Sequence, residues 1–477
     1  MSGTPDLLVV GAGPNGLVAA IRVARAGWRV RVIEAADMPG GGLRTTEATL
    51  PGFLHDHCAT VHPLALASPA FRALDLARHG LRWVHPEAPV AHALAPGRSV
   101  ILEQDLAAAR LALGRDGAAW ERLFGPLARE ADRLLPELLG PVIHRPRHPV
   151  LLARFGTPAL LPATTLARVA FRTDAARALF AGLAAHAILD LGRPLTAAFG
   201  LVLGLLAHAV GWPLAVGGSG AIARALVADA EACGVEIVTG QRVTSLRDLP
   251  PARATLLALT PRQVAAIAGD RLPAGERDRL AAWRHGPAAY KVDWALDGPI
   301  PWADPATARA ATVHIGGPIG EVAASERAMA HGRVTGRPFV LLVQPTHADP
   351  SRAPAGRHVG WAYCHVPNGW TGSMQEAIEA QVERFAPGFR DRILGRVVTD
   401  PAGFAAGNES YVGGDINGGI QDIRQLVFRP LPRLDPYRLG GAGLWIGSAA
   451  TPPGGGIHGM GGWNAAGSIL RAGTAGR

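Results

Sequence analysis

The sequence predicts an α/β fold in which a discontinuous nucleotide-binding domain alternates along the chain with a second domain of mixed sheet and helices. Residues 6–10 form a short apolar run that leads at once into a glycine-rich turn and a helical pattern. Segment 234–246 predicts two short strands on either side of Thr239 and Gly240, and 254–261 predicts a buried strand, so both add to the same parallel sheet roughly 200 residues later. Between 285 and 365 the pattern becomes that of a second, largely antiparallel sheet.

Length and composition agree with two large interleaved domains. The 477 residues correspond to about three domain-sized units or two large ones. Hydrophobic residues make up 48% and charged residues 18%, so the chain can bury a large core. We expect the nucleotide-binding domain to comprise 1–95, 211–284 and 431–477, and the second domain 96–210 and 285–430.

The cysteines exclude several classes of site. Cys58, Cys233 and Cys364 lie far apart and form no CxxC pair, which argues against a disulfide framework, a zinc ribbon and a dithiol redox centre. We expect no metal site. A reducing cytoplasm fits this cysteine usage, and no secretory signal is visible at the N-terminus.

The formal charge of +9 comes almost wholly from arginine, because Lys291 is the single lysine among 47 basic residues. The basic residues are scattered without a dense run, so we expect no nucleic-acid partner. In such a chain the remaining lysine stands out, since a compact ammonium can serve where a planar guanidinium cannot.

The longest uncharged stretch runs from Pro194 to Ala223. Its apolar helical part, residues 196–210, is about 15 residues long against the ~20 that a membrane span needs, so we expect a buried helix. Segment 134–155 alternates apolar and basic residues, which leaves peripheral contact with a membrane open.

The glycine turn carries the clearest chemical signal. Gly11, Gly13 and Gly16 form a GxGxxG between a strand and a helix, and Glu34 follows the next strand. The first glycine allows the tight turn, the second lets a pyrophosphate approach the backbone, and the third lets helix and strand pack closely. A carboxylate at residue 34 would accept ribose hydroxyls and repel a 2′-phosphate. This Rossmann-like unit therefore suits FAD or NAD.

An ordered set of motifs resembles one family over the whole chain. These motifs are VVGAGPNGLVAA with Glu34, MPGGGLRTTEATLPGFLHDHCATVHPLALASPAF, PLAVGGSGAIARAL with GVEIVTGQRV, and RPLPRLDPYR with GLWIGSAATPPGGGIHGMGGWNAA. The chain resembles the FAD-dependent phytoene-desaturase-related and amine-oxidase-like flavoproteins, in particular their bacterial phytoene-dehydrogenase-like branch. The resemblance implies an FAD-binding domain and a separate substrate-binding domain.

The motif and the resemblance together indicate which residues bind the cofactor. The resemblance places Arg44 on the phosphate and ribityl side of the flavin, Val243 at the adenine, and the start of the last helix at the pyrimidine end of the ring. The register of Arg44 is open by one or two positions, because this chain has three consecutive glycines where many relatives have GGR. The expected cofactor-binding residues are Gly11, Gly13, Pro14, Asn15, Gly16, Glu34, Ala35, Gly41, Gly42, Arg44, Val243, Gly447, Ser448, Gly459, Met460 and Gly461.

Three side chains are candidates for the reacting centre. The resemblance to amine oxidases implies that Lys291 reaches the flavin through a water, and a solvent-facing lysine is the alternative. His57 and His458 lie in segments that resemble flavin-contacting loops, where each would touch the ring, take a substrate proton or simply pack. His186 and His208, on apolar helical faces, are expected to be core histidines.

The expected activity is oxidation of a C–H bond in a largely apolar small molecule to form C=C or C=N, with oxygen or a quinone as electron acceptor. Two alternatives remain open on the same fold. One is a flavin-dependent isomerase without net redox, and the other is a flavin-binding interaction protein. Because one dinucleotide fingerprint is present and the flavin would occupy it, NAD(P)H is not expected to be a direct partner.

Overall fold

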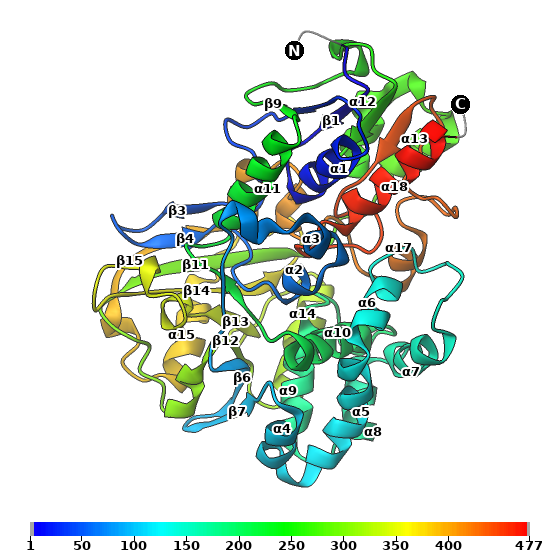
Figure 1. Cartoon of the computed structure of the whole chain (residues 1–477). Helices are drawn as coiled ribbons and strands as arrows, with labels where there is room; N and C mark the ends of the chain where they lie inside the picture. Colours follow the sequence, from blue (N-terminus) through cyan, green and yellow to red (C-terminus); the bar gives the residue numbers. More distant parts are fainter. Residues whose placement is uncertain (1–3, 475–477) are drawn as a thin grey trace.

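The computed structural model describes residues 4–474, and within this range two main sheets organise the molecule. Figure 1 shows the first sheet with its helices at the top and the second sheet below it. The first sheet is parallel and has the order β16 (Leu444–Ile446), β10 (Ala254–Leu257), β1 (Leu7–Val10), β2 (Val30–Ile33) and β9 (Glu236–Val238).

Helices cover both faces of the parallel sheet, which explains why β1 is apolar at every position. Leu7 and Val9 pack in the cluster that includes α1 (Pro14–Ala24), α11 (Gly220–Ala232) and α18 (Met460–Thr474). Leu8 and Val10 pack on the other face, with α12 (Pro261–Ala268) and α13 (Ala274–Ala281). The expected Rossmann-like unit is confirmed.

The second sheet is mixed and mostly antiparallel. Only the pairing of β12 with β6 is parallel among its described pairings. Its order is β15 (Ile393–Thr399), β11 (Ala288–Leu296), β14 (His358–Val366), β13 (Val340–Val343), β12 (Ala310–Ile315), β6 (Ala88–Ala95) and β7 (Arg98–Leu102).

The two faces of the second sheet have different partners. Tyr290, Val292 and Trp294 of β11 face a core that contains α15 (Gln375–Phe385). The alternate residues face the other way, where Lys291 and Asp293 contact β4 (Leu54–Asp56), and farther along the sheet β6 and β7 pack against helices of segment 106–209. Those helices are α4 (Leu106–Ala112), α5 (Gly117–Arg129), α6 (Ala131–Leu138), α7 (Pro149–Ala159), α8 (Ala163–Ala170), α9 (Asp174–Ala185) and α10 (Thr196–Ala209).

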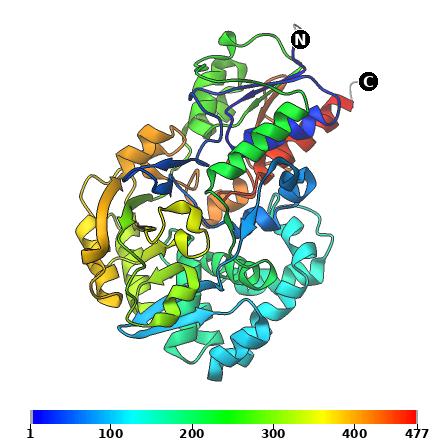
Figure 2. The same cartoon turned by 60° about the vertical axis from the view of Figure 1, so that its left-hand side comes forward.

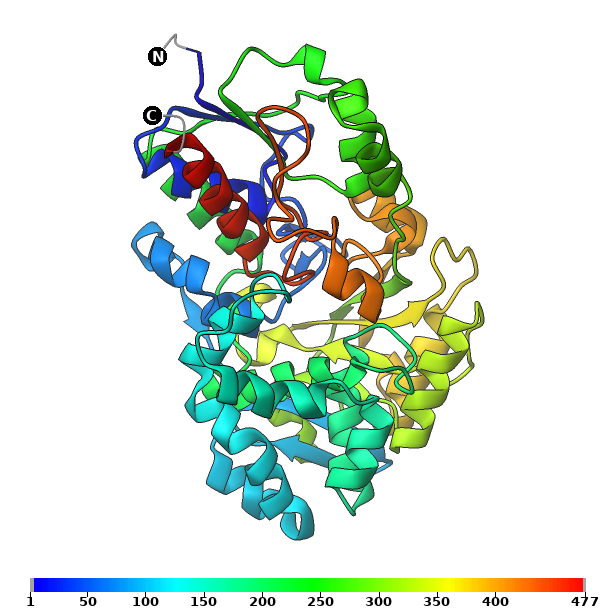
Figure 3. The same cartoon turned by 90° about the vertical axis from the view of Figure 1, so that its right-hand side faces the viewer.

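Shorter elements connect the two halves. Figure 2 shows the cyan and teal helices gathered at the bottom and right of the lower half. Figure 3 shows an orange helix where the two halves meet and the red C-terminal helix in the upper half. The remaining strands and α-helices of the described residues are β3 (Thr45–Glu47), α2 (Pro63–Ala67), α3 (Pro69–Leu74), β5 (Trp83–Val84), β8 (Leu214–Ala215), α14 (Ile319–Ala330), α16 (Pro401–Gly407) and α17 (Ile423–Phe428).

Two details differ from the sequence-based expectations. β6 pairs with β7 and β12, so it belongs to the second sheet, although the proposed boundary at residue 95 assigned it to the first domain. In segment 234–246 only β9 forms. The second strand expected after Gly240 does not form, because the amides of Gly240 and Gln241 donate to the loop that follows β2, at Ala36 O (3.0 Å) and Glu34 O (2.9 Å).

The long apolar stretch forms the buried helix α10, as expected. Leu201, Leu205 and Leu206 are fully buried within the main core. Within residues 4–474 no single helix is both long and apolar enough to cross a membrane. The bent pair α7 and α8 passes the same test of length and composition only when its two helices are taken together.

Helix α18 crosses α1 so closely that it requires a glycine. A Cβ at Gly462 would overlap the backbone of Asn15, whereas a Cβ at Gly467 would meet only the flexible ends of arginine side chains, at 3.3 Å or more. We therefore expect Gly462→Ala to lower the free energy of unfolding by about 1 to 3 kcal/mol, measured by urea denaturation. Gly467→Ala in the same helix is the control and should be neutral or stabilising. Equal stability of the two variants would contradict the close crossing.

Candidate functional site

The glycine turn after β1 has the geometry that the motif predicts. Gly11 has a φ of +101°, which favours glycine, and a Cβ there would meet Ala258 O at 3.1 Å. A Cβ at Gly16 would overlap the carbonyl of Gly11, so only glycine permits this approach of helix to strand. Gly13, at the N-cap of α1, borders open space, since a Cβ there would have no neighbouring atom within 4 Å. The turn thus offers helix amides to an anion.

Glu34 lies at the carboxyl end of β2 and closes the turn. Its carboxylate accepts hydrogen bonds from Ala12 N at 2.7 Å and Ala36 N at 3.0 Å. Both bonds fix the carboxylate beside the glycine turn while leaving lone pairs for further donors.

A cavity of about 560 Å³ runs along the carboxyl edge of the parallel sheet. This is the edge at which doubly wound sheets bind their ligands. Gly41, with a φ of +58°, brings a second backbone segment close to the turn, where a Cβ at Gly41 would lie 3.1 Å from Gly13. The expected residues that line this cavity are Gly11, Gly13, Pro14, Asn15, Gly16, Glu34, Ala35, Gly41, Gly42, Arg44, Val243 and Ser448.

Four expected cofactor residues, Gly447, Gly459, Met460 and Gly461, do not line this cavity. They pack instead: a Cβ at Gly459 would lie 2.7 Å from Val18, and one at Gly461 would lie 2.7 Å from the backbone of Ser448. Asn15 Oδ1 accepts the amide of Gly462 at 3.1 Å, which ties the start of α18 to the glycine turn.

The two candidate histidines are not brought together. His458 is buried and does not line this cavity. Its Nδ1 accepts the amide of Met460 at 3.0 Å, so it holds the turn before α18, and burial lowers its pKa to about 4. His57 is exposed, and its Nε2 hydrogen bonds with Thr46 Oγ1 at 2.9 Å.

The end of α16 and the segment after it form a wall of the cavity along the parallel sheet, and no sequence motif indicates this wall. Residues 406–411 line the cavity. Glu409 forms an ion pair at 2.6 Å with Arg242, which follows β9 of the parallel sheet. The hydroxyl of Tyr411 lies against Gly42, and burial and the neighbouring Cys58 raise the pKa of Tyr411.

A second, smaller cavity of about 190 Å³ adjoins the first. Ile416, Gly456 and Ile457 line both, so the two spaces adjoin at Ile416 and at the loop before α18. Most of the lining is apolar or aromatic, with Trp361 and Tyr363 of β14 among its residues.

Lys291 lines this smaller cavity and is only 2% exposed, so it is not a solvent-facing lysine. Its Nζ donates to both carboxylate oxygens of Asp293, at 2.6 and 2.7 Å, and to Asp56 O at 2.8 Å. Burial raises the pKa of Asp293, but Lys291 and His55 outweigh this and leave it below the usual range. The ammonium therefore has protein acceptors for its three N–H groups.

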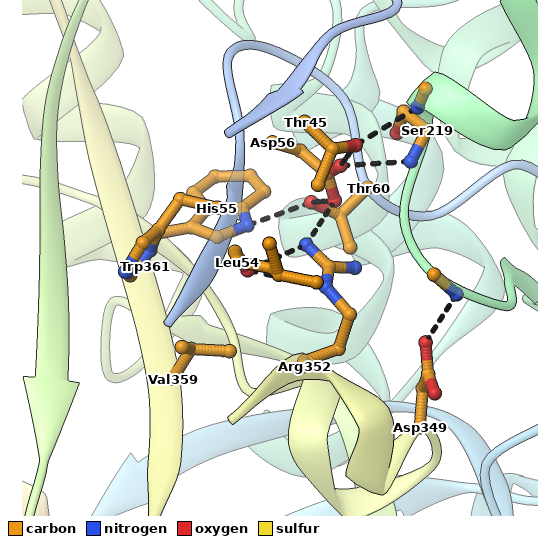
Figure 4. Close-up of polar contacts among 12 residues, drawn as sticks. Thr45, Leu54, His55, Asp56, Thr60, Ser219, Asp349, Arg352, Val359 and Trp361 are labelled. Carbon is orange, nitrogen blue, oxygen red and sulfur yellow. Dashed lines mark hydrogen bonds and ion pairs between the residues drawn. The ribbon is translucent and has the colours of Figure 1, made fainter. Parts of the chain in front are cut away.

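A buried ion pair supports this wall of the cavity (Figure 4). Asp56 accepts hydrogen bonds from Thr45, Thr60 and the amide of Ser219, at 2.6 to 2.8 Å, and pairs with Arg352 at 2.9 Å. Both charged side chains are fully buried. Burial raises the pKa of Asp56, but Arg352 and the hydroxyl donors outweigh it, so the pKa lies below its usual value.

Removing the Arg352 guanidinium should leave the Asp56 carboxylate as a buried charge without its partner. We expect Arg352→Met to lower the free energy of unfolding by about 3 to 5 kcal/mol, measured by urea denaturation at neutral pH. The matched control is Arg357→Met, since Arg357 is 42% exposed and its ion pair with Asp297 should be worth at most about 1 kcal/mol. Equal losses in the two variants would show that the Asp56 pair does not organise the site.

Comparisons with known proteins agree with this geometry. A family model described as an NAD(P)-binding Rossmann-like domain matches residues 9–75. The chain is 26% identical to pyridine nucleotide-disulfide oxidoreductase domain-containing protein 2 of Rattus norvegicus, over 98% of this chain and 93% of that protein. It is 28% identical to a phytoene dehydrogenase of Streptomyces griseus, over 81% of this chain and 77% of that protein.

Solved structures share the fold over nearly the whole chain. An oxidoreductase from Methanosarcina mazei superposes with a TM-score of 0.64 at 16% identity, covering 98% of this chain and 99% of the other. A putrescine oxidase bound to putrescine superposes with a TM-score of 0.62 at 17% identity, covering 99% of both chains. The relatives in sequence are oxidoreductases, and the solved structures show that this chain shares the fold of amine oxidases and other oxidoreductases.

Proposed function

We propose that this chain is an FAD-dependent oxidoreductase that oxidises a C–H bond of a largely apolar small molecule to form C=C or C=N. The observation that carries the proposal is the junction of the two cavities. The larger one follows the glycine turn and Glu34, and the smaller apolar one contains Lys291. A dinucleotide in the first would thus end beside a molecule in the second.

The residues around the larger cavity fit FAD. The open backbone at Gly13 accommodates a pyrophosphate, and Glu34 stands where ribose hydroxyls would lie. Val243 is buried in the wall and suits an adenine. Arg44 lines the cavity, and its Nε is buried without a hydrogen-bond partner among the described residues. A buried donor of this kind calls for an acceptor from a ligand.

The protein's own part is to orient the substrate and exclude water. FAD, when bound, supplies the hydride-accepting chemistry. The apolar lining of the smaller cavity suits an apolar substrate, and the Lys291 side chain lies at its wall. The Asp293 carboxylate holds the Lys291 ammonium in place.

The electron acceptor that we propose is oxygen or a quinone. A quinone would come from a membrane, and segment 134–155 supports peripheral contact there. Val142 and Ile143 are each 51% exposed and Val150 is 79% exposed, in a segment that also carries Arg145 and Arg147. Apolar side chains beside arginines suit the interface of an anionic bilayer. A cytoplasmic location remains part of this proposal.

The purified protein should be yellow and contain FAD. Glu34→Ala should weaken FAD binding by about 10- to 100-fold, because a hydrogen bond to a charged group contributes about 1.5 to 3 kcal/mol. The measurement is fluorescence titration of FAD into the apoprotein. The control is Glu47→Ala, an exposed carboxylate of β3, which should bind FAD like the unaltered protein. A colourless protein that FAD cannot reconstitute would refute the proposal.

Lys291 should assist reoxidation of the reduced protein. We expect Lys291→Met to retain FAD but to react with oxygen ~10²-fold more slowly, if the ammonium supplies about 3 kcal/mol of charge stabilisation. Stopped-flow mixing of the anaerobically reduced variant with oxygen measures this rate.

Because Lys291→Met also leaves Asp293 buried without its main partner, Asp293→Asn is the control. It breaks the same ion pair but keeps the ammonium, so its oxygen reaction should be slowed far less. Equal slowing in both variants would assign Lys291 a structural role, and unchanged reoxidation in Lys291→Met would favour a quinone acceptor.

A further inference from the structure

The smaller cavity has a second polar group of residues, at the end away from Lys291. Along one face of the second sheet, Lys291 of β11 is paired with Tyr363 of β14, then Leu341 of β13 and His314 of β12. These opposed residues point to the same side. Three strand spacings of ~4.8 Å place β12 roughly 14 Å from β11 across this floor.

Thr312 is two residues before His314 and shares its face of β12. Its register partner Val343 also lines the cavity, as Thr312 itself does. The side chain is 1% exposed, and Oγ1 has no hydrogen-bond partner among the described residues. A buried hydroxyl without a partner is rare in a protein interior and needs an explanation.

His186, at the C-cap of α9, covers the same end of the cavity. Its Nε2 lies 3.0 Å from His314 Nε2, so one of these two nitrogens donates a hydrogen bond to the other. Burial lowers the pKa of His186 to about 3, which keeps the ring neutral at physiological pH.

The surroundings of His314 decide which ring donates. His314 Nδ1 is buried against Gly182 of α9 and has no partner in the described chain. A buried N–H without an acceptor is less tolerable than a buried lone pair. We therefore assign the proton of His314 to Nε2, from which it is donated to His186 Nε2. A neutral His186 must then carry its own proton on Nδ1, for which residues 4–474 supply no acceptor.

We propose that Thr312 Oγ1 and His186 Nδ1 form a subsite for a hydroxyl or carbonyl oxygen of the substrate. The substrate class is an apolar molecule with an oxygen function remote from the C–H bond that is oxidised. Thr312 can donate or accept, whereas His186 donates, so an oxygen atom satisfies both. The statement that a C–H bond of this molecule is oxidised rests on the proposed function. The subsite rests on the cavity alone.

The experiment uses three probes that share an apolar body: 4-phenylbutan-2-one, 4-phenylbutan-2-ol and butylbenzene. Binding to the protein as purified is measured by isothermal titration calorimetry. We expect one or both oxygen-bearing probes to bind about tenfold more tightly than butylbenzene, as two neutral hydrogen bonds would allow. Preference for the ketone over the alcohol, or the reverse, distinguishes a carbonyl from a hydroxyl ligand.

Three variants separate recognition from general packing. Thr312→Val has nearly the same shape without the hydroxyl and should reduce the preference by about threefold. Thr312→Ser keeps the hydroxyl and should retain it. His186→Phe keeps an aromatic ring without the donor and should reduce the preference in the same way as Thr312→Val.

Equal binding of the three probes, a preference that neither Thr312→Val nor His186→Phe alters, or no binding up to the solubility limits would each overturn the subsite. If FAD binds normally in any of these cases, the subsite fails while the proposed function stands. A preference that responds to both variants in a protein without FAD would instead retain the subsite and refute the proposed function.

Discussion

The wall of the smaller cavity around Lys291 and Trp361 depends on the buried pair between Asp56 and Arg352. Two opposite charges without solvent are tolerated only if each is fully partnered. Asp56 meets that condition by collecting hydroxyl and amide donors from β3, from the loop after β4 and from the start of α11. Its carbonyl also accepts from Lys291 of β11. One carboxylate therefore fixes segments from both halves of the molecule.

The consequences extend along the wall of the smaller cavity. Thr60, which donates to Asp56, accepts the indole N–H of Trp361 at 2.8 Å, and the Lys291 ammonium lies 5.1 Å from the centre of the Trp361 ring. A shift of Asp56 would move both the charged and the aromatic parts of this wall. The remote polar end depends on a different contact, the close approach of α9 to β12 at Gly182.

Much of the nucleotide-binding half could be predicted from sequence, because its signals are local. Gly11, Gly13, Gly16 and Glu34 act within one strand, turn and helix unit, and their spacing alone fixes their places. The roles of Gly459 and His458 could not be predicted in this way. Each packs against a segment several hundred residues away in sequence, Gly459 against Val18 and the carbonyl of His458 against Ser68.

The sequence by itself determined the α/β class, the dinucleotide turn, the buried α10 and the singular position of Lys291, because periodicity and short motifs express local backbone preferences. Only the tertiary structure decided what those residues meet. It brought Asp56 to Lys291, moved β6 into the second sheet, and set His186, a predicted core histidine, against His314 at the cavity wall. Such contacts join distant parts of the chain, and sheet register and helix packing, which no local pattern records, determine them.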